Sequence, residues 1–126
     1  SEAFRTGRAA IAAGVTADVP AQVAIIQEEV RRMVAGMAIH YLNSTKQKVA
    51  DGESQNKVNH YMSEAWAFIY GVQFCANPDM DSQTVNGLLA QIDGGFEGFT
   101  QSTQSINATI DLIAAASGLE AFKNDL

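Results

Sequence analysis

Residues 20–49, PAQVAIIQEEVRRMVAGMAIHYLNSTKQKV, show the longest helical pattern of the chain. Five apolar residues follow one another at spacings of three and four residues: Val23, Ile26, Val30, Met33 and Met37. The same spacing continues through His40 to Ser44. This spacing places the side chains on one stripe of a helix and is typical of a heptad seam packed along its length in a bundle. Asp18 and Pro20 supply a start signal. We therefore predict one long helix over about 20–49.

Glycine, proline and short polar clusters divide the rest of the chain into further helices. A first helix is expected over 2–13, where Gly14 suits a left-handed cap. A third helix is expected over about 54–76, because Asn77-Pro78-Asp79 cannot continue the backbone ladder. The remaining expected elements are a loop over 15–19, a helix over 82–92 that starts at Asp81 and ends at Gly94-Gly95, a loop over 96–101 with two aromatics in the core, and a helix from Ser102 to Ser117 that Gly118 ends.

The composition fits one helical domain. At 126 residues the chain is large enough to bury a core, and its 47% apolar and 17% charged residues argue against disorder. No segment alternates apolar and polar residues next to turn residues, so no strand is predicted. We expect an all-α bundle of four main helices plus a short fifth, formed by residues 1–126 as a single domain.

Charge and cysteine usage narrow the range of partners. The formal net charge is −6, and residues 76–126 contain one basic residue, Lys123, against seven Asp and Glu. Such a surface repels phosphate backbones, so we expect no nucleic-acid partner. Cys75 is the only cysteine and is expected as a small buried apolar residue. No apolar run approaches the ~20 residues of a membrane span, and the opening on Ser1 without a signal peptide predicts a processed or fragmentary chain.

The stretch HYMSEAWAFIYG, residues 60–71, contains the strongest candidate for a site. His60 and Glu64 are four residues apart, so they share a face of a helix whose other residues, such as Trp66, are apolar. Helical bundles build metal sites from His and Glu on facing helices, so the pair fits half of a metal site or an acid–base pair. The alternative, which is the more frequent arrangement, is a structural pair that locks two helices.

His40 is the second candidate, because it falls in the seam of the long helix where Val or Met is expected. If the helices over 20–49 and 54–76 are antiparallel across a turn near residue 53, His40 lies level with about residue 66. It is then closer in height to Glu64 than to His60. His60, Glu64 and His40 are therefore the candidate metal ligands for iron or another divalent metal, but the difference in height does not favour joint ligation by both histidines. The alternative for His40 is a core histidine that satisfies a hydrogen bond, and we assign no catalytic residues.

Other charged residues have simpler explanations. Arg8 is either a solvated edge of the first helix or the partner of a buried carboxylate such as Glu64 or Glu29. The run Glu28-Glu29 with Arg31-Arg32 gives i,i+3 and i,i+4 pairs that stabilise a helix surface. The segment Asp79-Met80-Asp81 lacks the glycine and the glutamate of a calcium loop, so helix capping explains it better.

Three motifs occur in order along the chain: Phe4 to Ile11 (FRTGRAAI), Ala38 to Asn43 (AIHYLN) and His60 to Phe68 (HYMSEAWAF). Together they resemble the C-terminal half of a family of uncharacterised, imelysin-like bacterial envelope proteins. The resemblance implies an all-helical protein of two related bundle halves, exported to the periplasm or anchored as a lipoprotein. It also implies that an N-terminal half with its own His/Glu helix is missing from this chain.

Imelysin relatives carry a Gly-x-His-x-x-Glu motif that is suspected of binding metal, and they are associated with iron uptake. Only His60 and Glu64 carry over to this chain, where three residues separate them and Val58-Asn59 stands in place of the glycine. The altered spacing departs from the family's motif.

Three functions are consistent with these observations. The leading one is a non-enzymatic, imelysin-like envelope protein that binds iron, another metal or a small ligand. The second is a metal-dependent hydrolase that uses His60, Glu64 and His40. The third is a purely structural half-bundle whose partner is another helical half or subunit.

Overall fold

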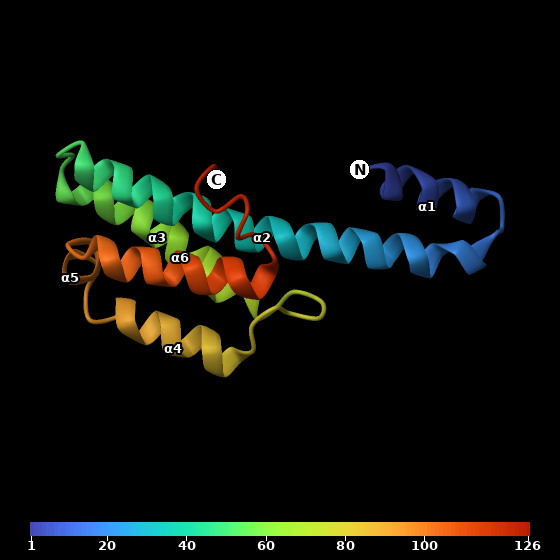
Figure 1. Cartoon of the computed structure of the whole chain (residues 1–126). Helices are drawn as coiled ribbons and strands as arrows, with labels where there is room; N and C mark the ends of the chain where they lie inside the picture. The colour runs from blue at the N-terminus through green and yellow to red at the C-terminus, as the bar shows by residue number, and fades with distance from the viewer.

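The computed structural model describes residues 1–126 and contains helices but no strands. The elements are α1 (Glu2–Ala12), the 3-10 turn η1 (Thr16–Asp18), α2 (Val19–Ala50), α3 (Gln55–Val72), α4 (Ser82–Ile92), α5 (Phe96–Thr100) and α6 (Thr103–Ser117). Residues 31–126 form a body, and residues 1–30, with α1 folded back on the start of α2, form an arm that projects from it (Figure 1). The predicted all-α bundle is confirmed. No helix is both long and apolar enough to cross a membrane.

The core of the body lies between the second half of α2 and the helices α3, α4 and α6. It contains 18 buried residues, among them Ala35, Ala38, Ile39 and Leu42 of α2. Small residues let α2 and α3 approach closely, and a Cβ atom added at Gly71 of α3 would lie 3.7 Å from Val34 Cγ1 of α2. The midpoint between residues 34 and 71 is near residue 53, which confirms the predicted antiparallel pairing across that turn.

Several helix ends follow the predicted capping signals. The Asp81 carboxylate accepts a hydrogen bond from the Thr84 backbone N–H at 2.8 Å and starts α4, and this bond lowers the pKa of the Asp81 carboxyl. The pKa of Asp81 is lower in the folded chain than in the unfolded chain. The cap therefore stabilises the fold at pH values above the ordinary pKa of Asp, and this stabilisation is lost as the pH falls through the lowered pKa. Ser102 caps α6 in the same way, and Gly118 ends that helix at φ 66°.

Three predicted boundaries differ from the structure. The expected loop over 15–19 contains η1, and Asp18 makes no capping hydrogen bond to α2. Helix α3 ends at Val72 instead of residue 76, because the next backbone N–H groups bond three residues back as a tight turn. That turn brings Met80 into the core. The expected loop over 96–101 contains α5, whose Phe99 is buried, so the prediction that its aromatics enter the core is confirmed.

The largest difference concerns the heptad seam of α2. The spacing predicts that the seam is buried along its length, yet Val23, Val30 and Met33 are exposed. Most buried residues of α2 lie on nearly the opposite side of the helix, given 3.6 residues per turn: Ala35, Ala38, Ile39, Leu42 and Thr45. Gly36 is also buried, but it lies beside the seam and lines the same groove as Met33 and Met37. The helix has 32 residues whereas its main partner α3 has 18, so α2 extends far beyond the body.

Core packing predicts different costs for two leucine truncations. We expect Leu42→Ala to lower the free energy of unfolding by about 2–5 kcal/mol, because the removed atoms leave a cavity in a fully buried site. Leu112→Ala on α6 is the matched control, since Leu112 is exposed, and should cost less than ~1 kcal/mol. Urea titration followed by circular dichroism measures both, and equal midpoints would contradict this description of the core.

Candidate functional site

The structure places the predicted metal ligands His60 and Glu64 on α3, where the imidazole is exposed and the carboxylate is half-buried. The His60 ring lies edge-on to Tyr61, with 5.6 Å between the ring centroids. No group of three His, Cys, Asp or Glu side chains anywhere in the chain is arranged to hold a metal ion. A site built on this pair would therefore need ligands from outside the chain.

His40 is exposed on α2 instead of lying in a packed seam. It lines a groove together with Met33 and Met37 of α2 and with Leu119 and Leu126 of the C-terminal segment. Because the structure does not gather His40, His60 and Glu64 into one ligand group, the proposed metal site stays a prediction.

The residues that join the two histidine-bearing helices are the tyrosines next to the histidines. Tyr41 of α2 stacks on Phe68 of α3 with 5.6 Å between centroids, and its ring lies 6.3 Å from that of Tyr61. Lys48 Nζ lies 5.5 Å from the centroid of the Tyr61 ring, a cation–π contact. The repeated His-Tyr order in the sequence therefore marks an aromatic contact between α2 and α3.

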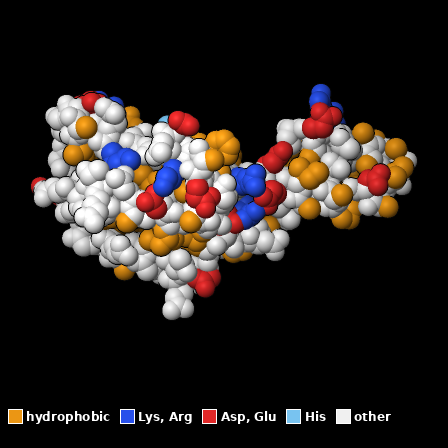
Figure 2. Space-filling model, in the orientation of Figure 1, with side chains coloured by type: hydrophobic (Ala, Val, Ile, Leu, Met, Phe, Trp, Pro, Cys, Tyr) orange, Lys and Arg blue, Asp and Glu red, His pale blue; other side chains and the backbone are white.

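The arm contains an apolar groove between α1 and the start of α2. We call it the arm groove; its volume is about 270 Å³ and its lining is Ala3, Phe4, Gly7, Arg8, Ile11, Val19, Gln22, Val23 and Ile26. Only Ala3 of α1 is buried, while Phe4 and Ile11 are 60% and 62% exposed. Figure 2 shows hydrophobic side chains gathered over the arm, outside the body. An uncovered apolar surface of this kind is typical of a binding site.

A second groove continues along α2 toward the body. We call it the seam groove; its volume is about 380 Å³ and its lining is Glu29, Arg32, Met33, Gly36, Met37, His40, Leu119 and Leu126. Val23 and Ile26 line the arm groove and Met33 and Met37 line the seam groove, while Val30 is exposed between the two grooves. The heptad series of the sequence thus forms one apolar stripe along α2, which α1 borders at the arm groove and Leu119 and Leu126 border at the seam groove.

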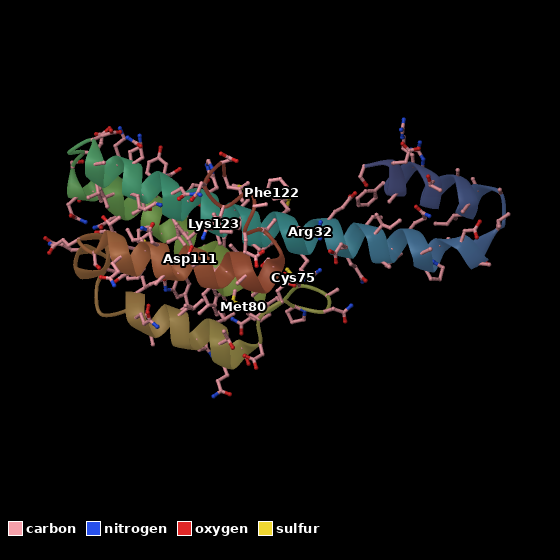
Figure 3. All side chains as sticks on the ribbon, in the orientation of Figure 1. Arg32, Cys75, Met80, Asp111, Phe122 and Lys123 are labelled. Carbon is pink, nitrogen blue, oxygen red and sulfur yellow. The ribbon has the colours of Figure 1, made fainter.

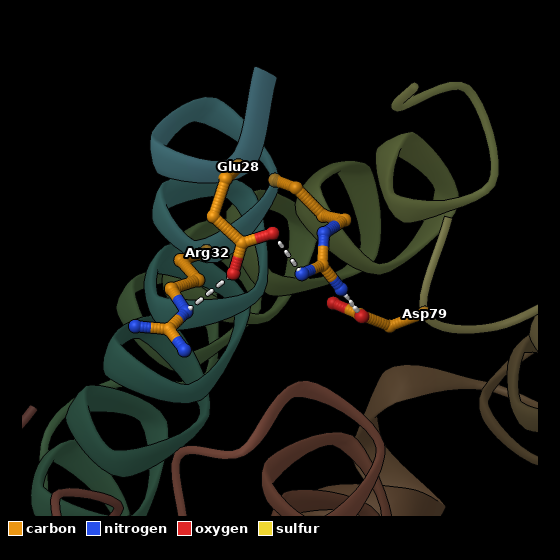
Figure 4. Close-up of polar contacts among 4 residues, drawn as sticks. Glu28, Arg32 and Asp79 are labelled. Atoms are coloured by element: carbon orange, nitrogen blue, oxygen red, sulfur yellow. Dashed lines mark hydrogen bonds and ion pairs between the residues drawn. The ribbon is translucent and has the colours of Figure 1, made fainter. Parts of the chain in front are cut away.

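A network of ion pairs fixes the base of the arm. Arg31 pairs with Glu28 of the same helix and with Asp79 of the α3–α4 connection, and Arg32 Nε lies 3.0 Å from Glu28 Oε1 (Figure 4). The side chains of Asp79 and Arg31 are only 5% and 18% exposed. The hydrogen bond from Arg31 lowers the pKa of the Glu28 carboxyl. The hydrogen bond between Arg31 and Glu28 therefore stabilises the fold at pH values above the ordinary pKa of Glu, and this stabilisation is lost as the pH falls through the lowered pKa.

Sequence reasoning found the helical pairs of this network but missed Asp79. A pair between residues 31 and 79 leaves no periodic signal, because its partners meet only when the chain after α3 folds back onto α2. That connection also contains Met80 and Cys75 (Figure 3). Cys75 is half-buried, and burial raises the pKa of its thiol despite the nearby Arg31. A thiol held protonated is a poor nucleophile, which fits a packing role.

Arg8 does not pair with Glu64 or Glu29, which sequence reasoning considered. It forms no ion pair, whereas its neighbour Arg5 lies 3.1 Å from Glu2. Arg8 instead lines the arm groove and, with Phe4 and Arg5, a recess beside it. The rim of the arm groove therefore carries an unpaired positive charge.

Comparison with known proteins gives one family match. Residues 1–120 match the family described as "Domain of unknown function (DUF4856)". No curated protein and no solved structure is significantly similar to the chain.

The ion-pair network predicts unequal effects of two neighbouring arginines. Arg31→Ala leaves the buried Asp79 carboxylate without its counter-charge, and we expect a loss of roughly 2–3 kcal/mol in unfolding free energy, below the full cost for a completely buried pair. Arg32→Ala is the matched control, because Arg32 is 58% exposed and pairs on the surface; its expected cost is at most about 1 kcal/mol. Equal losses in chemical denaturation would show that Arg31 does not anchor the connection.

Proposed function

We propose that this chain, which belongs to the DUF4856 family, is a non-enzymatic helical module that binds an amphipathic helix of another helical half or subunit. The observation that carries the proposal is the continuous apolar face formed by the arm groove, Val30 and the seam groove. A helix in a groove is the partner that such a face fits, because its apolar side chains recur at the same three- and four-residue spacing.

Charge specifies the partner further. The apolar lining of the arm groove supplies most of the contact area, while Arg8 stands on its rim without an acidic partner. A partner helix with Asp or Glu beside its apolar stripe would pair with that charge, which favours the correct partner and raises the rate of encounter. We therefore infer as the occupant an amphipathic helix with acidic residues on the flank that meets Arg8 at the arm groove.

The enzymatic and metal-binding hypotheses receive less support from the geometry. The hydrolase would use His60, Glu64 and His40, but these residues do not form a group that could hold a metal ion. A role in binding iron or another metal then depends on ligands from the other helical unit. The interaction proposal needs no residue beyond those already on the exposed face.

A relationship to imelysin-like proteins, with a periplasmic or lipoprotein location, is part of the same proposal. Its support is the order of the three motifs, which lie on α1, α2 and α3. An N-terminal bundle half would be the natural source of the partner helix. Immunoblotting of fractionated source cells tests the location, and recovery of the protein in the cytosolic fraction alone would contradict it.

Binding is tested with a labelled three-heptad peptide that has Leu at the a and d positions and Glu at the flanking positions. Fluorescence anisotropy should show saturable binding to the chain, and Phe4→Ala should weaken it about tenfold because the ring lines the arm groove. Phe74→Ala is the matched control, since Phe74 is also exposed but does not line the arm groove or the seam groove, and it should leave the affinity unchanged.

A second peptide with Lys in place of Glu tests the charge. At low salt the Glu peptide should bind several-fold more tightly, and added salt should reduce the difference. If the wild-type chain binds neither peptide, or if both phenylalanine variants lose affinity equally, the proposed function is wrong. Light scattering of the chain alone shows whether a second copy occupies the face instead.

Metal addition separates the interaction proposal from a complete metal site. We expect Fe²⁺, Zn²⁺ or Cu²⁺ to leave the melting temperature of the isolated chain unchanged, because no three ligands meet. A clear rise that His60→Ala abolishes, while His40→Ala also reduces it, would establish a site within the chain and contradict this expectation.

A further inference from the structure

The C-terminal segment, residues 119–126, lies against the same face of α2 that we propose as the docking face. It follows α6 and crosses above α2, where Figure 1 shows the C-terminus. Leu126 and Leu119 form one wall of the seam groove, opposite Met33 and Met37. A Cβ atom added at Gly36 would lie 3.9 Å from Leu126 Cδ1. Leu126 therefore lies at the edge of the groove that a partner helix would enter.

The segment is held by a small number of polar contacts. Asn43 of α2 donates from Nδ2 to the backbone carbonyl of Lys123 at 2.7 Å and to that of Leu126 at 3.2 Å. Lys123 Nζ lies 2.5 Å from Asp111 Oδ1 on α6, and Figure 3 shows these two residues with Phe122. Phe122 is 58% exposed, whereas Leu119 packs against the core and Leu126 is 36% exposed, so the apolar contacts of the segment come from its two leucines.

We propose that residues 119–126 act as a strap that competes with the partner helix for the seam groove, with Asn43 as its clasp. This inference rests on the proposed function and specifies how the same face is regulated. With the strap in place, Leu119 and Leu126 line the seam groove beside the half-buried Met37, while Met33 and His40 stay exposed. A partner helix then reaches the arm groove, Val30 and Met33, but Leu126 restricts its approach to Met37. Release of the strap extends the docking face along α2 toward the body.

The strap has a defined energetic consequence. A partner that needs the full face binds only the fraction of molecules with the strap released, so its affinity is reduced by that fraction. Weakening the hydrogen bonds of Asn43 raises the fraction of molecules with the strap released, and the partner then binds more tightly. A segment that only stabilises the body would have the opposite signature, because its loss would lower stability without strengthening binding.

The experiment uses the full chain, the same Glu-flanked peptide and the variant Asn43→Ala. Hydrogen exchange of the amides of residues 122–126 should become faster, and the peptide should bind about three- to tenfold more tightly than to the wild type. Asn59→Ala on α3 is the matched control, because Asn59 bonds only to Gln55 of its own helix, and it should change neither readout. Leu126→Ser removes the apolar contact of the strap with the seam groove but keeps the backbone carbonyl that accepts from Asn43. This variant should also bind the peptide more tightly.

The outcomes are distinct. Faster exchange with unchanged affinity overturns the strap, and so does unchanged exchange in Asn43→Ala, because Asn43 is then not the clasp. If neither the wild type nor the variants bind the peptide, the proposed function itself fails. Binding by the wild type that is equal in all variants leaves the proposed function standing and removes only the strap.

Discussion

Antiparallel packing of α2 against α3 builds the core around which the other helices of the body are arranged. Ala35, Ala38 and Gly71 keep the two helices close, and branched residues such as Ile39 and Ile69 fill the core beside them. At 1.5 Å per residue the two helices are about 48 Å and about 27 Å long. The mismatch leaves the first part of α2 without a partner from the body, so the arm is a direct consequence of helix length.

The arm is held at its base, where α2 leaves the body. Arg31 lies where α2 leaves the body, and its pair with the nearly buried Asp79 ties the connection after α3 to that point. The same connection brings Met80 into the core. A tight turn after Val72 serves both contacts, which explains why α3 stops before Asn77-Pro78 requires it to stop.

The proposed function follows from what the body leaves uncovered. One apolar stripe of α2 is bordered by α1 at one end and by the C-terminal segment at the other, and neither covers its centre at Val30. An acidic amphipathic helix satisfies both the spacing of the stripe and the free charge of Arg8. The histidines attract attention in the sequence, but their structural neighbours are the tyrosines that connect α2 with α3.

Four features follow from the sequence alone: the helical class, the order of the helices, the caps at Asp81, Ser102 and Gly118, and the level at which α2 meets α3. These features depend on residues close together in the chain, where periodicity, capping chemistry and turn residues act locally. Tertiary packing decided which stripe of α2 is buried, because two stripes of that helix are apolar and long-range contacts select one. It also decided the pairing of Arg31 with Asp79 and the absence of a third ligand beside His60 and Glu64. Such contacts join residues far apart in sequence, and local spacing carries no information about them.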